Sequence, residues 1–200
     1  MFFLIFLNML LSIVIPAYNE ALTIHKILDK INEVELQGGF KKEVILVNDC
    51  SKDATEEAVK RYISEHPDLN IQYVAHTVNK GKGAALHTGI RVSTGDYIII
   101  QDADLEYDPA EFLRLVRPIV DGQADVVYGS RFLQGKPKTQ TWHHWLANRL
   151  LTWLSNRFTG LKLTDMETCQ KLFKREALAG VKICEDRFGV EPELTAKIAQ

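Results

Sequence analysis

The stretch Tyr97-Ile98-Ile99-Ile100-Gln101-Asp102-Ala103-Asp104 joins an apolar run to two acidic residues. The run of β-branched residues predicts a buried strand over 97–100. Asp102 and Asp104 are two positions apart at its exit, so their side chains are expected on the same side. Paired carboxylates repel each other unless a cation joins them, and oxygen ligands suit Mg²⁺ or Mn²⁺. A solvated turn that caps a helix is the alternative for the same residues.

Apolar runs alternate with helical patterns along the first two thirds of the chain. Further strands are predicted over 11–15, 44–47, 71–75 and 126–128. This alternation predicts an α/β fold, with a mainly parallel sheet flanked by helices in a single domain. Ligands of such sheets bind beyond the carboxyl ends of the strands. Polar segments follow four of the predicted strands there, at 16–20, 48–51, 79–83 and 102–104. We expect these four segments to converge on one edge of the sheet.

The composition excludes several classes of protein. A chain of 200 residues is the size of one domain, and its net charge of −2 argues against nucleic acid as a partner. The three cysteines are odd in number and have no Cys-x-x-Cys spacing. They fit a reducing compartment and give no support to a disulfide framework or a zinc site. We therefore expect a cytoplasmic protein.

The two ends of the chain carry separate expectations. Residues 1–9 form an apolar extension before a domain over 10–200, and Met9 is an alternative natural start. The apolar run that ends at Pro16 is too short for a membrane span, which needs about 20 residues. The last helical pattern, over 193–200, has no terminator. We expect the natural chain to continue beyond it.

Several other residues are candidates for binding or chemistry, each with a plainer alternative. The glycine-rich turn at 79–83 enters a helix, where backbone amides attract phosphate, but it is otherwise an ordinary turn. Asp49 either accepts hydrogen bonds from a base or ribose or serves turn chemistry. Arg131 would hold a phosphate with its planar guanidinium or make a surface ion pair. Asp165 and Glu167 would supply a base or lie in a solvated loop.

A helix is predicted over 142–158 with a wide apolar face that ends before Gly160. All three tryptophans lie in it, and residues 131–164 contain basic side chains but no Asp or Glu. Tryptophan and arginine beside apolar residues are typical of interfacial helices. The helix has three interpretations. It packs on the core, it lies at a membrane interface, or it contacts a protein partner.

Together, segments 12–20, 47–53, 79–83, 102–106 and 129–132 resemble family 2 glycosyltransferases of the GT-A fold. The closest branch makes dolichyl- or polyprenyl-phosphate sugars, and the resemblance covers roughly residues 11–200. It implies a nucleotide-binding half over about 10–130 and an acceptor half over about 131–200. Nucleotide-sugar contacts are expected from Pro16, Tyr18, Glu20, Asp49, Lys80, Gly81, Asp102 and Ala103. The resemblance also implies metal ligation by Asp102, Asp104 and Glu106, and contact of Arg131 with phosphate near the acceptor.

The expected activity is inverting, metal-dependent transfer of a hexose from a nucleotide sugar to a polyprenyl or dolichyl phosphate. Asp104, Arg131 and Asp165 are the candidates for the chemistry, with Mg²⁺ or Mn²⁺ as the cofactor. The expected partners are the donor, the lipid phosphate, a membrane surface to which the protein binds peripherally, and a membrane subunit. A saccharide or protein acceptor is the first alternative, and it would need Asp165 or Glu167 as a base. A non-catalytic nucleotide-sugar-binding subunit is the second.

Overall fold

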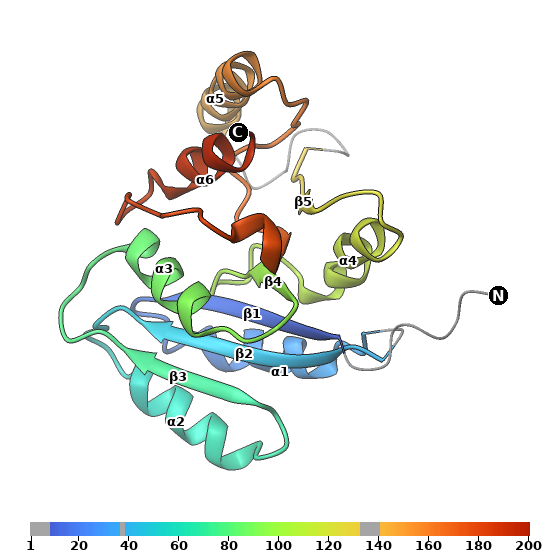
Figure 1. Ribbon diagram of the computed structural model, residues 1–200. Helices are drawn as coiled ribbons and strands as arrows, with labels where there is room; N and C mark the ends of the chain where they lie inside the picture. The colour runs from blue at the N-terminus through green and yellow to red at the C-terminus, as the bar shows by residue number, and fades with distance from the viewer. Residues whose placement is uncertain (1–8, 37–38, 133–140) are drawn as a thin grey trace.

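The computed structural model describes residues 9–36, 39–132 and 141–200. A six-stranded sheet with the strand order β3-β2-β1-β4-β6-β5 forms its centre (Figure 1). The strands are β1 (Leu10–Ala17), β2 (Lys41–Asn48), β3 (Ile71–Ala75), β4 (Tyr97–Ile100), β5 (Val126–Tyr128) and β6 (Lys171–Lys174). The helices are α1 (Ile24–Glu33), α2 (Thr55–Glu65), α3 (Lys82–Val92), α4 (Phe112–Val120), α5 (Trp142–Thr159) and α6 (Val190–Ile198). Short 3₁₀ turns cover Pro109–Glu111 and Arg175–Leu178.

The predicted mainly parallel sheet is confirmed. Strands β1 to β4 pair with one another in parallel, and β6 is antiparallel to both β4 and β5. Each of the five strands predicted before residue 130 is present, within three residues at either end. Strand β6 enters the sheet between β4 and β5, so the final strand of the sequence separates two earlier ones. Most of the expected extension at 1–9 lies outside the described residues.

Helices cover both faces of the sheet, which explains the apolar runs Ile13–Ile15, Val44–Val47 and Ile98–Ile100 in its central strands. On one face, α1, α2 and α4 pack against a cluster that includes Ile13, Ile15 and Leu46. On the other face, α3 and α6 pack against a cluster that includes Val14 and Ile45. Consecutive residues of β1 therefore point into different halves of the core.

Helix α5 lies at the end of the molecule farthest from β3, next to α6 (Figure 1). Thr141 caps its start by accepting a hydrogen bond from the His144 amide, and Gly160 ends it with a left-handed backbone at φ 74°. This helix has the boundaries that the sequence predicts, within one residue. Its packing differs from that of the other helices, because it does not lie on the sheet.

Candidate active site

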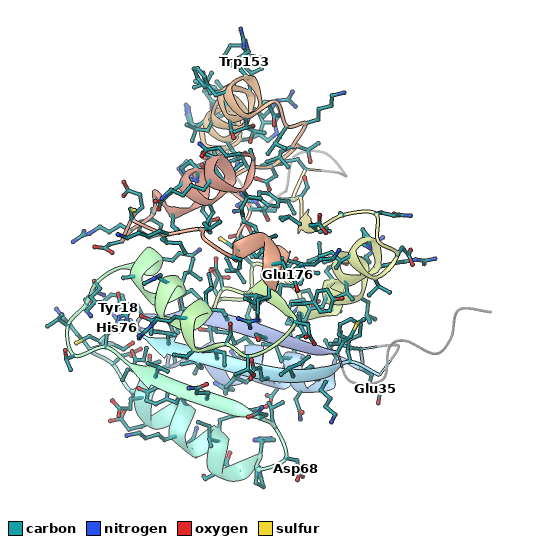
Figure 2. All side chains as sticks on the ribbon, viewed as in Figure 1. Tyr18, Glu35, Asp68, His76, Trp153 and Glu176 are labelled. Carbon is teal, nitrogen blue, oxygen red and sulfur yellow. The ribbon has the colours of Figure 1, made fainter. Side chains whose placement is uncertain are left out.

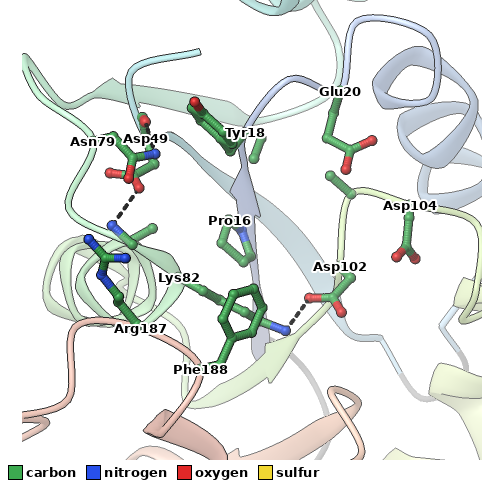
Figure 3. A pocket seen from close by; sticks show the side chains of 14 residues that line it. Pro16, Tyr18, Glu20, Asp49, Asn79, Lys82, Asp102, Asp104, Arg187 and Phe188 are labelled. Atoms are coloured by element: carbon green, nitrogen blue, oxygen red, sulfur yellow. Dashed lines mark hydrogen bonds and ion pairs between the residues drawn. The ribbon is translucent and has the colours of Figure 1, made fainter. Parts of the chain in front are cut away.

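A cavity of about 380 Å³ opens at the carboxyl ends of β1, β2 and β4 (Figure 3). All four polar segments that follow the predicted strands contribute to it, together with a segment just before α6. Its lining is formed by Pro16, Ala17, Tyr18, Glu20, Asp49, Asn79, Gly81, Lys82, Ala85, Asp102, Ala103, Asp104, Arg187 and Phe188. Seven of the eight residues expected to contact a nucleotide sugar are in this set. Lys80 is the exception, and its side chain is exposed.

The two acids after β4 both line the cavity but have different partners. Asp102 forms an ion pair with Lys82, with 2.8 Å between its Oδ1 and Nζ. Asp104 accepts a hydrogen bond at Oδ1 from the backbone amide of Glu106 (2.9 Å). Its Oδ2 accepts no hydrogen bond from the described part of the chain. Unlike Asp102, Asp104 forms no ion pair within the described residues, so its carboxylate is available to a cation.

Glu106 does not join these two acids. Its side chain lies 3.4 Å from a guanidinium nitrogen of Arg131 and does not line the cavity. Within residues 9–36, 39–132 and 141–200, no cluster of three or more His, Cys, Asp or Glu side chains could hold a metal. The expected ligand set of Asp102, Asp104 and Glu106 is therefore not assembled. A free carboxylate oxygen of Asp104 fits Mg²⁺ or Mn²⁺, which take further oxygen ligands from phosphates and water.

Lys82 is a cavity residue that the sequence analysis missed. Besides Asp102, its Nζ lies 3.0 Å from Cys169 Sγ and 3.6 Å from Glu191 Oε1. Burial would lower the pKa of Lys82, but Asp102 and the other acidic neighbours raise that pKa above its ordinary value. Lys82 is therefore protonated, and its charge is paired with that of Asp102. Lys82 belongs to the glycine-rich segment 79–83, which the sequence analysis placed at the site. Lys82 itself was not named as a binding residue.

Asp49 is buried and organises the glycine-rich turn. Its Oδ1 accepts hydrogen bonds from the Lys80 amide (2.9 Å) and lies 2.7 Å from His76 Nδ1. Its Oδ2 accepts a hydrogen bond from the Gly81 amide (2.6 Å). These amides were expected to bind phosphate, but in the structure they bind Asp49. Asp49 consequently fixes the conformation of the turn, and it also lines the cavity.

The glycines of the turn make room for another segment of the chain. A Cβ on Gly83 would lie 1.9 Å from the Glu185 carbonyl oxygen, and one on Gly81 would lie 2.4 Å from that of Asp186. Residues 185–188 therefore lie directly across the start of α3. This close approach brings Arg187 and Phe188 to the cavity (Figure 3). Sequence analysis missed both residues, because nothing in their local sequence indicates this long-range contact.

Arg131 and Asp165 lie outside the cavity and bind each other. Arg131 donates from Nε to Asp165 Oδ2 (2.8 Å) and from one terminal nitrogen to Oδ1 (3.0 Å). Burial would lower the pKa of Arg131, but Asp165 and Tyr107 raise it above its ordinary value. The structure brings these two expected residues together as an ion pair. Its geometry does not fit Asp165 as a free base.

Glu167 is the other acid of this loop that was considered as a base. It is partly buried, and burial raises its pKa above the ordinary value. Glu191 adds to this shift, while Lys171 opposes it. A carboxyl group with a raised pKa is better suited to proton transfer near neutral pH than one paired with arginine. Glu167 has no arginine partner like that of Asp165 within the described residues, and its role as a base stays a prediction.

Helix α5 places its apolar side chains on the outside. Its buried residues are Asn148 and Thr152, whereas Trp153 is 61% exposed and Phe158 is 84% exposed. Figure 2 shows Trp153 on the outer side of the helix. Leu146, Leu150, Leu151 and Leu154 are exposed as well. Within the described part of the chain, this apolar face does not pack on the core. None of the helices described here is long and apolar enough to cross a membrane.

The chain matches known proteins along most of its length. Residues 12–181 match Glycosyl transferase family 2. An undecaprenyl-phosphate 4-deoxy-4-formamido-L-arabinose transferase from Pseudomonas aeruginosa (strain LESB58) is 30% identical over 96% of this chain and 55% of its own length. A dolichyl-phosphate beta-glucosyltransferase from Dictyostelium discoideum is 35% identical over 62% of this chain and 40% of its own. The chain thus spans about half the length of the curated relatives it matches.

Solved structures share the fold. The mannosyltransferase PcManGT from Pyrobaculum calidifontis, in complex with GDP-Man and Mn²⁺, has a TM-score of 0.65 and 26% identity. That comparison covers 92% of this chain and 50% of the mannosyltransferase. The GT-A fold expected from the sequence is therefore confirmed.

Proposed function

This chain belongs to glycosyl transferase family 2, and we propose that it transfers a hexose, with inversion, from a nucleotide sugar to a polyprenyl or dolichyl phosphate. The observation that carries this proposal is the charge arrangement of the cavity. Lys82 and Arg187 supply positive charge, while Asp104 offers an unused carboxylate oxygen to a divalent cation. A nucleoside diphosphate with its cation has the charge pattern that matches both.

Different residues of the cavity would contact different parts of the donor. Pro16, Tyr18 and Glu20, on the chain that leaves β1, would contact the nucleoside. Asp104 would hold Mg²⁺ or Mn²⁺, whose chemistry at this site is to neutralise the diphosphate leaving group. Lys82 and Arg187 would contact the same phosphates from the other side of the cavity. Their charges favour the transition state because negative charge grows on the leaving group.

A phosphate acceptor needs no general base, so it suits a site in which Asp165 is paired with Arg131. The second pKa of a phosphate monoester is about 6, so at neutral pH the acceptor is already largely a dianion. It can therefore attack without a base. Arg131 is the candidate contact for this phosphate, since the edge of its guanidinium that does not bind Asp165 still carries N–H donors.

The test is turnover of a donor panel with and without a polyprenyl phosphate. GDP-mannose and UDP-glucose are the first donors to compare, with Mn²⁺ or Mg²⁺ present. Transfer that requires the lipid phosphate supports the proposal. Transfer to a saccharide or protein would show that the acceptor is not a lipid phosphate. Glu167 would then be the candidate base. Donor binding without turnover on any acceptor would favour a non-catalytic subunit.

We also propose that α5 binds a membrane surface, so that the protein associates peripherally with the bilayer that holds its acceptor. The exposed apolar side chains of α5 would enter the interface, and Arg149 and Arg157 would meet anionic head groups. Each basic residue near such a surface contributes about 1 kcal/mol, which salt weakens. The three free thiols fit the cytoplasmic side. A membrane subunit remains a candidate partner for the same face.

Vesicle sedimentation tests this second proposal. Trp153→Ala combined with Phe158→Ala should reduce binding to anionic vesicles, and high salt should reduce binding of the unmodified protein. Leu113→Ala removes an exposed leucine from α4 and serves as the control, because it lies on another helix. Binding that the double variant leaves unchanged would rule out α5 as the membrane contact.

A further inference from the structure

The ion pair between Arg131 and Asp165 holds the guanidinium in one orientation. Both oxygens of Asp165 accept from Arg131, and the Arg131 backbone amide donates to Oδ2 as well (3.1 Å). The Asp165 side chain is fully buried, whereas that of Arg131 is 18% exposed. Only the remaining terminal nitrogen faces away from Asp165, and it lies 3.4 Å from Glu106 Oε1. Arg131 therefore has one bound edge and one edge directed toward the loop that carries Asp104.

Helix α5 supplies a second partner for the same carboxylate. The Asn148 side-chain amide donates to Asp165 Oδ1 (3.1 Å). The hydroxyl of Thr152, one turn later, donates to the side-chain oxygen Oδ1 of Asn148 (3.1 Å) and accepts from the Met166 backbone amide (3.1 Å). Because Asn148 Oδ1 accepts from Thr152, the side-chain NH₂ group of Asn148 must face Asp165. The inner side of α5 is thus connected to Arg131 through one buried carboxylate.

We propose that Asp165 and Asn148 are positioning residues, which hold Arg131 so that its other edge, which faces Glu106 in the structure, meets the acceptor phosphate. This inference rests on the proposed function, in which a lipid phosphate is the acceptor. The helix whose outer side carries the apolar face also supplies the inner contact to Asp165. Asn148 therefore links the surface proposed to meet the lipid with the arginine proposed to bind its phosphate.

The chain offers a matched control on the same helix. Asn156 lies two turns after Asn148, and its side chain bonds both the amide and the carbonyl of Leu163 (2.9 and 2.8 Å). It therefore anchors α5 to the same loop, two residues before Asp165, without touching the ion pair. If Asn148 served only to attach α5, the two asparagines would be equivalent. If Asn148 positions Arg131, only its loss should affect the acceptor.

The experiment compares Asn148→Ala, Asp165→Asn and Asn156→Ala in steady-state kinetics with a polyprenyl phosphate and the donor that the unmodified protein uses. Loss of a hydrogen bond to a charged group should raise the acceptor KM about tenfold or more for Asn148→Ala and Asp165→Asn. The donor KM should change less than twofold in both. Asn156→Ala should lower thermal stability and leave the acceptor KM unchanged. Equal effects of the two asparagine substitutions on acceptor KM would overturn the proposal, as would parallel changes in donor and acceptor KM.

A readout without turnover separates this inference from the proposed function. Absence of transfer by the unmodified protein would refute the lipid-phosphate acceptor. The Arg131 Nε–H signal in ¹⁵N NMR, assigned by its loss in Arg131→Lys, would still report on the ion pair. Asn148→Ala should speed exchange of this proton with water severalfold, and Asn156→Ala should not. An exchange rate unaffected by Asn148→Ala would overturn the positioning role even if Asp165→Asn does not fold.

Discussion

Lys82 and Asp102 form an ion pair on the floor of the cavity, with 2.8 Å between the ammonium nitrogen and the carboxylate oxygen. Both side chains are about five-sixths buried, at 15% and 16% exposure. Water therefore screens the pair only weakly. The first acid of the pair after β4 is already neutralised by a protein cation, and the second acid, Asp104, is left for a metal. The two carboxylates thus have different tasks despite their equivalent place in the sequence.

Asp104→Ala should abolish binding of a divalent cation together with the donor. A metal at a developing negative charge contributes several kcal/mol, so transfer should fall by about 100-fold or more. Mn²⁺ binding in the presence of nucleoside diphosphate, followed by electron paramagnetic resonance, measures the first effect directly. Excess chelator should inactivate the unmodified protein, and added Mn²⁺ or Mg²⁺ should restore it. Full transfer in excess chelator would contradict the metal requirement.

Arg131→Lys should impair use of the acceptor. Lysine keeps the charge but lacks the planar fork that pairs with Asp165 and a phosphate together. Loss of a charge-assisted contact costs about 1.5–3 kcal/mol, or roughly ten- to a hundredfold in the acceptor KM. Steady-state kinetics with varied lipid phosphate measure this, and donor binding should be nearly unchanged. Equal weakening of donor binding would place Arg131 in the donor site instead.

Gly83→Ala should destabilise the protein and weaken donor binding together. The added methyl would lie 1.9 Å from the Glu185 carbonyl oxygen, so residues 185–188 must move away and take Arg187 with them. Overpacking of this kind typically costs about 1–3 kcal/mol. Thermal unfolding and titration with nucleoside diphosphate measure the two effects. His87→Ala, at an exposed position of α3, should change neither. Unchanged donor affinity in a destabilised Gly83→Ala protein would exclude segment 185–188 from the donor site.

Glu43 should make the stability of the protein depend on pH in the acidic range. Burial would raise the pKa of Glu43, but hydrogen bonds from Ser12, Thr94 and the Gly95 amide outweigh it and lower the pKa below its ordinary value. The ionised form is therefore favoured by folding. Its contribution is present above the unfolded pKa of about 4.3 and is lost as the pH falls through the folded value.

Glu43→Gln is the matching substitution. It should lower the free energy of unfolding by about 1–3 kcal/mol at pH 7, because the buried amide cannot accept the same bonds. In urea unfolding between pH 7 and pH 3, the difference in free energy of unfolding between the two proteins should shrink as the pH falls below about 4.3. A difference that stays constant over this range would show that ionisation of Glu43 does not contribute.

The sequence was sufficient to predict the sheet and the edge where the cavity lies. Apolar runs such as 97–100 are buried on both faces, and this pattern is typical of parallel strands alternating with helices. Because parallel strands end on the same edge, Pro16, Asp49 and Asp102 could be brought together without any structure. Their joint presence in the cavity lining follows from topology alone.

The remaining features depend on contacts between distant segments. Arg187 reaches the cavity only because Gly83 lets residues 185–188 lie against α3, and no local pattern indicates this. Asp165 has the same sequence signature as a solvated acid, and only its burial against Arg131 reveals an ion pair. The spacing of Asn148, Thr152 and Asn156 at every fourth residue was visible in the sequence. It marks the inner face of α5, which the apolar residues on its outer face concealed.

The most direct test of the account is transfer from a radiolabelled nucleotide sugar to a polyprenyl phosphate in anionic vesicles with Mn²⁺. The account predicts a labelled lipid-linked product that forms with the unmodified protein and disappears with Asp104→Ala. It also predicts that the product will be absent when the lipid phosphate is replaced by the corresponding polyprenol, because a neutral hydroxyl lacks the charge that Arg131 binds. Equal labelling of the polyprenol, or undiminished labelling by Asp104→Ala, would contradict it.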